Sequence, residues 1–262
     1  MDAWAQLWNP QSATLALGTF GLLWLRLLPL TVLAPWFIWM KTPWILRIAV
    51  ALSFALAFFP LAFSAHRAAP QSVWNWGACG IRELAIGMVF AVAASIPLYA
   101  LEWTGSLLDT WRGAAEHPAA GQGPLEKLML IMGVALFIAC GGHRVAVAIF
   151  ADTLIHLPPL EYTRVDWASL ALGSGRLVAD GLALTVMFSA PFIVALFIVE
   201  ATLVSTARVS PGFPVSLIGG PARAGAILVV LLIVLATIAT HLPEVFQHLL
   251  ASTKTLLRNF AR

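Results

Sequence analysis

Three ionisable residues stand inside or beside long apolar stretches, where a charge is costly. Arg26 interrupts the first stretch, Glu200 follows the fifth, and His143 comes directly after Gly141 and Gly142. Ionisable groups at membrane depth usually face a bundle interior, a pore or a partner. Two interpretations stay open: a buried relay for protons or substrate, or structural ion pairs and interface contacts. No second acid stands at helical spacing from Glu200, which favours the structural interpretation.

His143 and Ser174 are further residues whose types could carry catalysis. A metal site at His143 would need a histidine or an acid one helical turn away, and Val147 stands there. A serine protease would need a histidine base in reach of its serine, whereas Ser174 lies in a polar Gly-Ser-Gly stretch that predicts a flexible loop. The sequence contains no Walker, Rossmann or HExxH pattern. We therefore predict no enzymatic activity, no metal and no cofactor.

The composition indicates the environment that holds these residues. Of the 262 residues, 60% are hydrophobic and only 10% are charged, whereas soluble domains carry about 25% charged residues. A soluble core of this size could not hide so much apolar surface, so lipid or partner subunits must cover it. The net charge of +3 is scattered along the chain, which argues against a nucleic-acid partner. Cys79 and Cys140 have neither metal nor disulfide spacing.

Six charge-poor stretches have about the length that a helix needs to cross the hydrocarbon core of a bilayer. They are residues 13–40, 48–65, 84–101, 128–142, 181–199 and 224–240. Their apolar residues are continuous rather than alternating, which predicts helices and not barrel strands. Pro29, Pro35, Pro97 and Pro191 lie inside these stretches, and proline removes a helix hydrogen bond. We therefore expect an all-α fold of about six hydrophobic helices, some of them broken by proline and buried against partners.

Two longer polar linkers separate the stretches, near residues 102–127 and 156–180. The first contains acidic residues together with several glycines and prolines, and the second contains charges of both signs. No internal repeat or low-complexity tract divides the chain, so one folding unit over residues 1–262 is expected. Lys and Arg are shared almost equally between the two sides of six spans, which leaves the membrane orientation open.

Short motifs of proline, glycine and charged residues follow one another in order along most of the chain. They are Arg26-Leu27-Leu28-Pro29, Ala34-Pro35, Pro43 with Arg47, Arg82-Glu83-Leu84 with Ile86-Gly87, Glu102-Trp103-Thr104-Gly105, Asp109 with Arg112-Gly113, Phe137 with Gly142-His143, Asp152 with Leu157-Pro158, Ala190-Pro191, Arg208-Val209-Ser210-Pro211 and Gly219-Gly220-Pro221. In this order and spacing the chain resembles the FliR/SctT family of type III export proteins. The Arg112-Gly113 pair and Pro97 are more similar to the virulence-type SctT branch than to the flagellar FliR branch.

The resemblance implies a core subunit of the export gate in the bacterial inner membrane, at the base of the secretion apparatus. Its helices would form hairpins that assemble with the SctR and SctS counterparts, and it would also contact the SctU and SctV counterparts and membrane lipid. Unfolded secreted proteins would be the cargo. The alternative is a proton-coupled small-molecule transporter or channel that uses Arg26, Glu200 and His143. Transporters tend to contain internal repeats, and this sequence has none.

The resemblance also implies roles for single residues. In the family a loop of this subunit plugs the channel, and the matching segment is about 109–124. The plug candidates are Asp109, Arg112, Gly113, Gly121 and Gly123. The charges expected to serve structure or interfaces are Arg26, Glu83, His143, Glu200 and Arg208.

Overall fold

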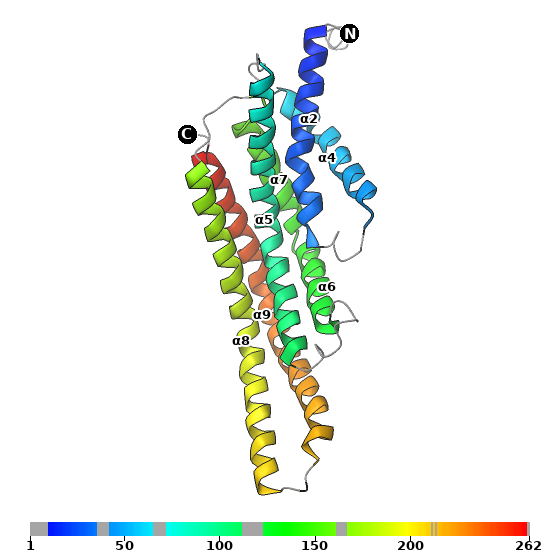
Figure 1. Cartoon of the computed structure of the whole chain (residues 1–262), viewed down its shortest axis with the longest axis vertical. Coiled ribbons are helices and arrows are strands. Elements are labelled where there is room, and N and C mark those ends of the chain that lie inside the picture. The colour runs from blue at the N-terminus through cyan, green and yellow to red at the C-terminus, as the bar shows by residue number, and fades with distance from the viewer. Residues whose placement is uncertain are drawn as a thin grey trace. The chain divides into compact units, whose positions relative to one another are not determined.

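The computed structural model describes residues 10–35, 42–64, 72–111, 123–160, 167–210, 212 and 214–260. Its helices are α2 (Pro10–Leu33), α4 (Trp44–Ser64), α5 (Val73–Trp111), α6 (Pro124–Ala139), α7 (Gly142–His156), α8 (Trp167–Val209) and α9 (Val215–Phe260) (Figure 1). The described ranges contain no strand, so the predicted all-α fold is confirmed. Five of the described helices are long and apolar enough to cross a membrane, and the spans become six if α6 and α7 count as one broken span.

Most prolines of the apolar stretches lie inside helices rather than at their ends. Pro29 lies within α2, Pro97 within α5 and Pro191 within α8, and the helix continues on both sides of each. None of these three prolines ends its helix. In membrane proteins, neighbouring helices and side-chain hydroxyls can satisfy the carbonyl that a proline leaves free. Pro35 acts as expected, because α2 ends at Leu33 and the residue before a proline disfavours helix.

The chain turns between α6 and α7, inside the stretch 128–142 that we predicted as one span. The Cys140 N–H donates to the carbonyl of Leu136 at 2.8 Å, and Gly141 follows with φ of 72°. A left-handed glycine after the last helical residues is a common way for a helix to end. A new helix begins at Gly142, so this stretch belongs to two helices.

Both polar linkers are shorter than predicted. Residues 102–111 continue α5, residues 124–127 begin α6, and residues 167–180 begin α8. The helices extend beyond their apolar centres, so charged residues do not mark where they end. Gly173 illustrates the error, since a Cβ atom there would overlap the side chain of Leu256. This glycine allows close helix packing rather than a loop.

The chain divides into two compact units. Unit 1 comprises Met1–Ser95, Gly142–Val178 and Gln247–Arg262, and unit 2 comprises Ile96–Gly141 and Ala179–Phe246. Each unit has an apolar core of its own. The single domain over the whole chain stays a prediction, because two compact units can belong to one domain.

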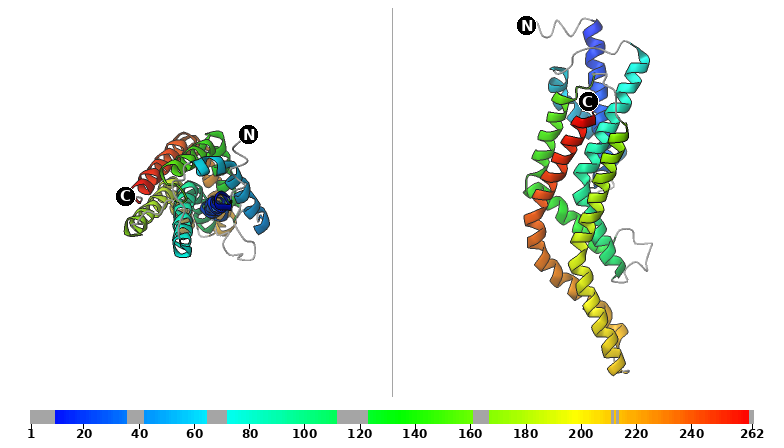
Figure 2. Two further views of the ribbon diagram at one scale, coloured as in Figure 1. Left: turned by 90° about the horizontal axis from the view of Figure 1, so that it is seen from above. Right: turned by 90° about the vertical axis from the view of Figure 1, so that its left-hand side faces the viewer.

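Unit 1 is built around the pair α2 and α4, which run side by side (Figures 1 and 2). Its core contains Leu23 and Leu27 of α2, Ala55 of α4, Phe90 of α5 and Phe150 of α7. The Phe90 and Phe150 rings meet edge to face, with centroids 5.5 Å apart. Alanine on the inner side of α4 lets the neighbouring helices approach closely.

Unit 2 brings parts of α5, α6, α8 and α9 together. The rings of Phe137 on α6 and Phe246 on α9 have centroids 4.7 Å apart. A Cβ atom on Gly133 would lie 2.8 Å from the Leu101 side chain, so glycine sets the spacing of α6 and α5. The buried hydroxyl of Thr104 donates to the carbonyl of Ala100, one turn earlier in the same helix, at 2.8 Å.

Candidate functional site

A buried ionic cluster joins three segments of unit 1. The Nε of Arg26 on α2 donates to Oε2 of Glu83 on α5 at 2.5 Å, and both side chains are completely buried. Arg26 Nη2 also donates to the carbonyl of Leu157, directly after α7, at 2.9 Å. The charge inside the first apolar stretch is thus paired within the protein, which offsets part of the cost of burying it.

Arg82 extends this cluster. Its Nη1 donates to the carbonyl of Pro158 at 3.3 Å and lies 3.9 Å from Oε1 of Glu83. Two arginines therefore hold the chain that leaves α7, through two consecutive carbonyls. With two guanidinium groups and one carboxylate, the cluster carries a net charge of +1. The family motifs include Glu83, but nothing in the sequence indicates that it pairs with Arg26.

The helix crossing beside the cluster is tight. A Cβ atom on Gly87 would overlap the Arg26 carbonyl oxygen and lie 3.0 Å from the Arg26 Cα atom. Gly87 lies one helical turn after Glu83, so glycine there lets α5 approach the backbone of α2. This approach places the Glu83 carboxylate within reach of the Arg26 guanidinium.

Glu200 is paired within unit 2. Its Oε1 accepts a hydrogen bond from Nε of Arg223, which joins α8 to α9. The Glu200 side chain is 39% exposed and that of Arg223 is 30% exposed. The sequence around Glu200 does not point to Arg223, because this base lies 23 residues further along the chain on the other helix of the hairpin.

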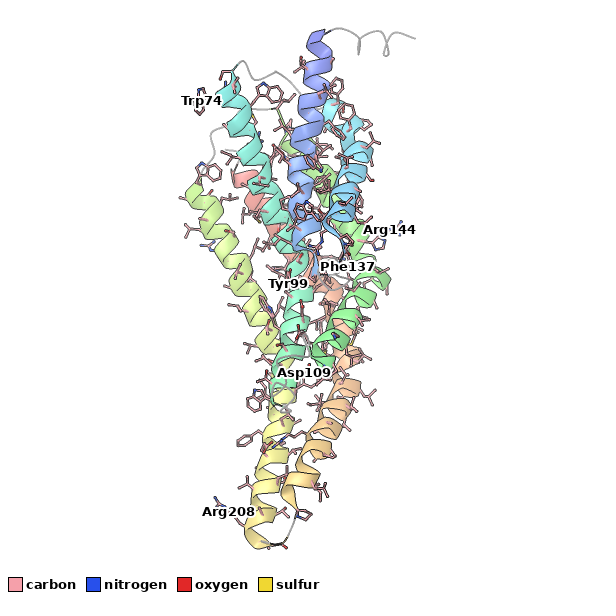
Figure 3. The ribbon with its side chains drawn as sticks, turned by 45° about the vertical axis from the view of Figure 1, so that its right-hand side comes forward. Trp74, Tyr99, Asp109, Phe137, Arg144 and Arg208 are labelled. Carbon is pink, nitrogen blue, oxygen red and sulfur yellow. The ribbon has the colours of Figure 1, made fainter. Side chains whose placement is uncertain are left out.

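The relay proposed for Arg26, Glu200 and His143 has no support in these contacts. Arg26 and Glu200 belong to different units, and each is engaged by a counter-ion of its own. His143 is exposed in the first turn of α7. Arg208 is exposed in the last turn of α8 (Figure 3), where a cation interacts favourably with the helix dipole.

Asp109 fastens the start of α6 to the end of α5. Its Oδ2 accepts the backbone N–H groups of Leu125 at 2.9 Å and Glu126 at 3.0 Å. The first N–H groups of a helix have no partner inside it, and an anion is favourable at that end. The buried Asp109 carboxylate thus closes the two ends of the segment that we predicted as the plug.

Glycines make this junction possible. A Cβ atom on Gly105 would lie 2.5 Å from the Glu126 Cα atom, and one on Gly123 would overlap the Asp109 carboxylate. Gly123 has extended backbone and precedes α6 directly. The importance of Gly105 was missed in the sequence, because nothing in its neighbours indicates the approach of another helix. Among the predicted plug residues, Arg112, Gly113 and Gly121 lie outside the described residues.

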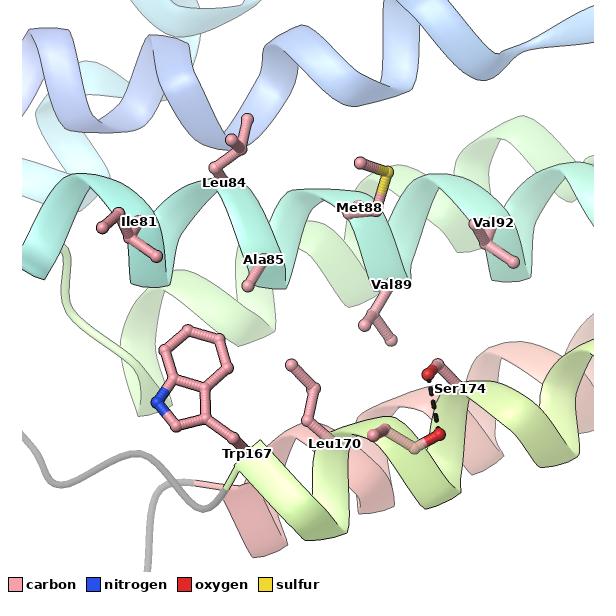
Figure 4. Close-up of a pocket in the computed structure, with 10 residues that line it drawn as sticks. Ile81, Leu84, Ala85, Met88, Val89, Val92, Trp167, Leu170 and Ser174 are labelled. Atoms are coloured by element: carbon pink, nitrogen blue, oxygen red, sulfur yellow. Dashed lines mark hydrogen bonds between the residues drawn. The ribbon is translucent and has the colours of Figure 1, made fainter.

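Ser174 lies in α8, so its predicted flexible loop is wrong, and it lines an apolar groove of unit 1. The groove has a volume of about 390 Å³ and runs between α5 and α8 (Figure 4). Ala85 and Val89 of α5 face Trp167 and Leu170 of α8 across the groove. The Ser174 hydroxyl donates to the carbonyl of Ala171, in the preceding helical turn, at 3.0 Å. The lining residues include neither a histidine nor an acid that could activate this serine.

Comparison with known proteins gives the family. The model of bacterial export proteins, family 1, matches residues 17–249 of the chain. The chain is a bacterial export protein of the FliR/SctT family. No protein with a curated function matches its sequence. The match covers the buried ionic cluster, the Asp109 junction and the Glu200–Arg223 pair, so all three are features of this export protein. Its long apolar helices make it a membrane protein.

Proposed function

We propose that this export protein is a core subunit of the type III secretion export gate. It would form part of the channel through which unfolded proteins cross the bacterial inner membrane. The observation that carries the proposal is the family match over residues 17–249, supported by the ordered FliR/SctT motifs. The Arg112-Gly113 pair and Pro97 favour the virulence-type SctT branch. The proposed partners are the SctR and SctS counterparts, with the SctU and SctV counterparts as further contacts.

The proposed role is passive. The subunit forms part of the channel wall and of its seal, and other components supply the energy that moves the cargo. No step needs a nucleophile or a base from this chain. The buried cluster of Arg26, Arg82 and Glu83 has a structural part in this mechanism, because it fixes α2, α5 and the end of α7 to one another.

The proposed plug is the segment 109–124. The composition of this segment, rich in glycine and alanine, predicts few anchoring contacts between its two ends. We therefore expect the segment to open at a low free-energy cost compared with a packed helix. Asp109 supports this assignment, because it fastens α6 to α5 at the base of the segment. The flanking helices would keep their places while the segment between them moves.

Purification tests the assembly. The tagged chain is expressed in cells that carry the complete secretion apparatus, extracted in a mild detergent, and the co-purifying proteins are identified by mass spectrometry. We expect the SctR and SctS counterparts in a stable complex with the chain. Recovery of the chain without either of them, from cells in which both are present, would contradict the proposal.

A deletion tests the plug. Removing residues 113–122 leaves Asp109 and Gly123 in place, so the α5–α6 junction and the assembly should persist. We expect cells with the co-expressed complex to become permeable to ions and small molecules, and Arg112→Ala to give a milder leak. Arg144→Ala, at an exposed position of α7, is the control and should leave the membrane tight. A complex that forms with the deletion and still seals the membrane would show that this segment is not the plug.

A further inference from the structure

Helix α5 has one accessible face within unit 2, along the length that Tyr99 and Asp109 mark in Figure 3. Its other sides are packed: Leu101 and Gly105 lie against α6, and the buried Thr104 hydroxyl lies 3.4 Å from a carbonyl of α8. The accessible residues follow one another at intervals of three or four, or are direct neighbours, which places them on a single face of the helix. In residues 96–110 they are Tyr99, Glu102, Trp103, Ser106, Leu107 and Thr110. We name these six residues the α5 face.

The first turn of the α5 face combines a carboxylate with two aromatic rings. The Tyr99 and Trp103 rings are stacked, with centroids 5.9 Å apart and an angle of 22° between their planes. Glu102 lies three residues after Tyr99 and directly before Trp103, so its side chain leaves the helix beside the stack. Trp103 is 41% exposed, so part of its ring is open to a further contact.

The neighbouring turns of α5 do not balance the negative charge of this face. Lys, Arg and His are absent from the sequence between Arg82 and Arg112, so no base stands one helical turn from Glu102. The Oε2 atom of Glu102 is buried, which withdraws the carboxylate partly from water. A charge in such a place interacts more strongly with a counter-ion than a charge in open water does.

We propose that the α5 face is a docking surface for a partner helix that presents an arginine to Glu102 and Trp103. A guanidinium group is planar, donates parallel hydrogen bonds to a carboxylate and also stacks on aromatic rings. One arginine can therefore contact both residues together. The compact ammonium group of a lysine acts as a point charge and fits this pair of surfaces less well.

The length of the face favours a helix over a lipid headgroup as the occupant. From Tyr99 to Thr110 the face extends about 17 Å along α5, which is about three helical turns. A cationic headgroup would occupy only the turn that contains Glu102, whereas a helix can also pack along Ser106 and Leu107. The inference rests on the proposed function in one respect, since the partner helix would belong to another subunit of the export gate.

Photocrosslinking identifies the occupant. Leu107 of the full chain is replaced by a photoreactive benzophenone amino acid in cells that carry the complete secretion apparatus, and the crosslinked peptides are sequenced by mass spectrometry. We expect a peptide from an apolar helix of another subunit, with an arginine within two helical turns of the crosslinked residue. Leu128 of α6 is the matched control position, because its exposed fraction is also 41%, and it should not yield this peptide.

The crosslinks separate this inference from the proposed function. A crosslink from position 107 to lipid alone, or to a helix without such an arginine, would overturn the docking proposal. Co-purification of the SctR and SctS counterparts is measured in the same cells. If both co-purify while position 107 crosslinks to no protein, the docking proposal fails and the proposed function stands. The reverse result would contradict the proposed function alone.

Dissociation of the complex tests the arginine contact. The complex is immobilised through the crosslinked partner, and the rate at which the chain leaves it is measured in mild detergent. Glu102→Gln keeps the shape of the side chain and should raise this rate at least roughly tenfold. Trp103→Leu should raise it by roughly twofold to thirtyfold, the range of a cation–π contact. Glu244→Gln removes an acid that is 78% exposed on α9 and should leave the rate unchanged.

A charge exchange completes the test and controls for misfolding. Glu102→Arg alone should prevent a stable complex, and so should replacement of the partner's arginine by glutamate. The two changes together should restore the complex, which would show that the Glu102→Arg chain folds. An unchanged dissociation rate in Glu102→Gln, or no restoration by the exchange, would overturn the proposal.

Discussion

Glu83 is the one acid in the buried cluster of Arg26, Arg82 and Glu83, and both arginines depend on it. Replacing it with Gln leaves two buried cations with a net charge of +2. Replacing Arg26 with Met leaves Arg82 and Glu83, whose charges cancel. Arg82 then still lies 3.9 Å from the Glu83 carboxylate. The charge balance therefore predicts that Glu83→Gln, although nearly isosteric, destabilises the protein more than Arg26→Met does.

We predict that Glu83→Gln lowers the free energy of unfolding by about 3–5 kcal/mol, the usual cost of breaking a buried ion pair. Arg26→Met should cost less, roughly 1–3 kcal/mol. Both values can be measured by denaturant titration in mixed micelles. Lys254→Met is the control: it removes a half-exposed pair with Asp152, which should cost about 1 kcal/mol or less. An equal or larger loss for Arg26→Met than for Glu83→Gln would contradict the charge argument.

Asp109 gives a second prediction at the scale of single residues. Asp109→Ala removes the acceptor of two N–H groups and should destabilise the α5–α6 junction by about 1 kcal/mol. If the segment 109–124 is the plug, the same variant should raise ion conductance through the co-expressed complex. Asp109→Asn keeps one acceptor oxygen and should have a smaller effect on both. If the conductance of the Asp109→Ala complex stays at the level of the unaltered complex, the α5–α6 junction does not contribute to sealing the channel, and the prediction is wrong.

At the scale of helices, Gly87 and Gly77 form a natural pair on α5. Gly87 faces the α2 backbone, whereas a Cβ atom on Gly77 would meet nothing within 4 Å. We predict that Gly87→Ala costs about 1–3 kcal/mol, as overpacking does, since backbone atoms cannot move aside as a side chain can. Gly77→Ala should be neutral or stabilise by up to about 1 kcal/mol, because alanine favours helix. The comparison uses unfolding in detergent, and a loss in Gly77→Ala as large as in Gly87→Ala would refute it.

The helices themselves could be predicted from the sequence, whereas their contacts could not. Apolar runs such as 181–199 are continuous, and that pattern alone predicts a buried or membrane helix. The predicted helix ends were wrong because a glycine such as Gly173 indicates a loop in the sequence. Only the structure shows that the Leu256 side chain packs against it. Of the candidate site, the Arg26 and Glu200 charges could be named, but not their partners Glu83 and Arg223, which lie 57 and 23 residues away in sequence. Only the folded chain brings such residues together.

At the scale of the whole molecule, the exposed apolar surface predicts that the stability of the chain depends on partner proteins or lipid around it. Large side chains such as Leu56 of α4 and Phe197 of α8 are more than 60% exposed, and apolar patches of this kind mark interaction surfaces. We predict that the chain expressed alone is unstable or aggregates on extraction, and that co-expression with the SctR and SctS counterparts gives one stable complex. Size-exclusion chromatography in mild detergent distinguishes these outcomes. A monodisperse, folded monomer from the chain alone would contradict the prediction.

The distance along the chain between Arg26 and Glu83 has a consequence for biogenesis. The two residues are 57 positions apart, and a ribosome that adds about 5–20 residues per second takes roughly 3–11 s to travel from one codon to the other. Throughout that interval the nascent α2 carries a cation without its counter-ion, and an arginine in the middle of an inserting helix costs about 2.5–3.5 kcal/mol. We therefore expect α2 to reach its final depth only after α5 has been translated and Glu83 can pair with Arg26.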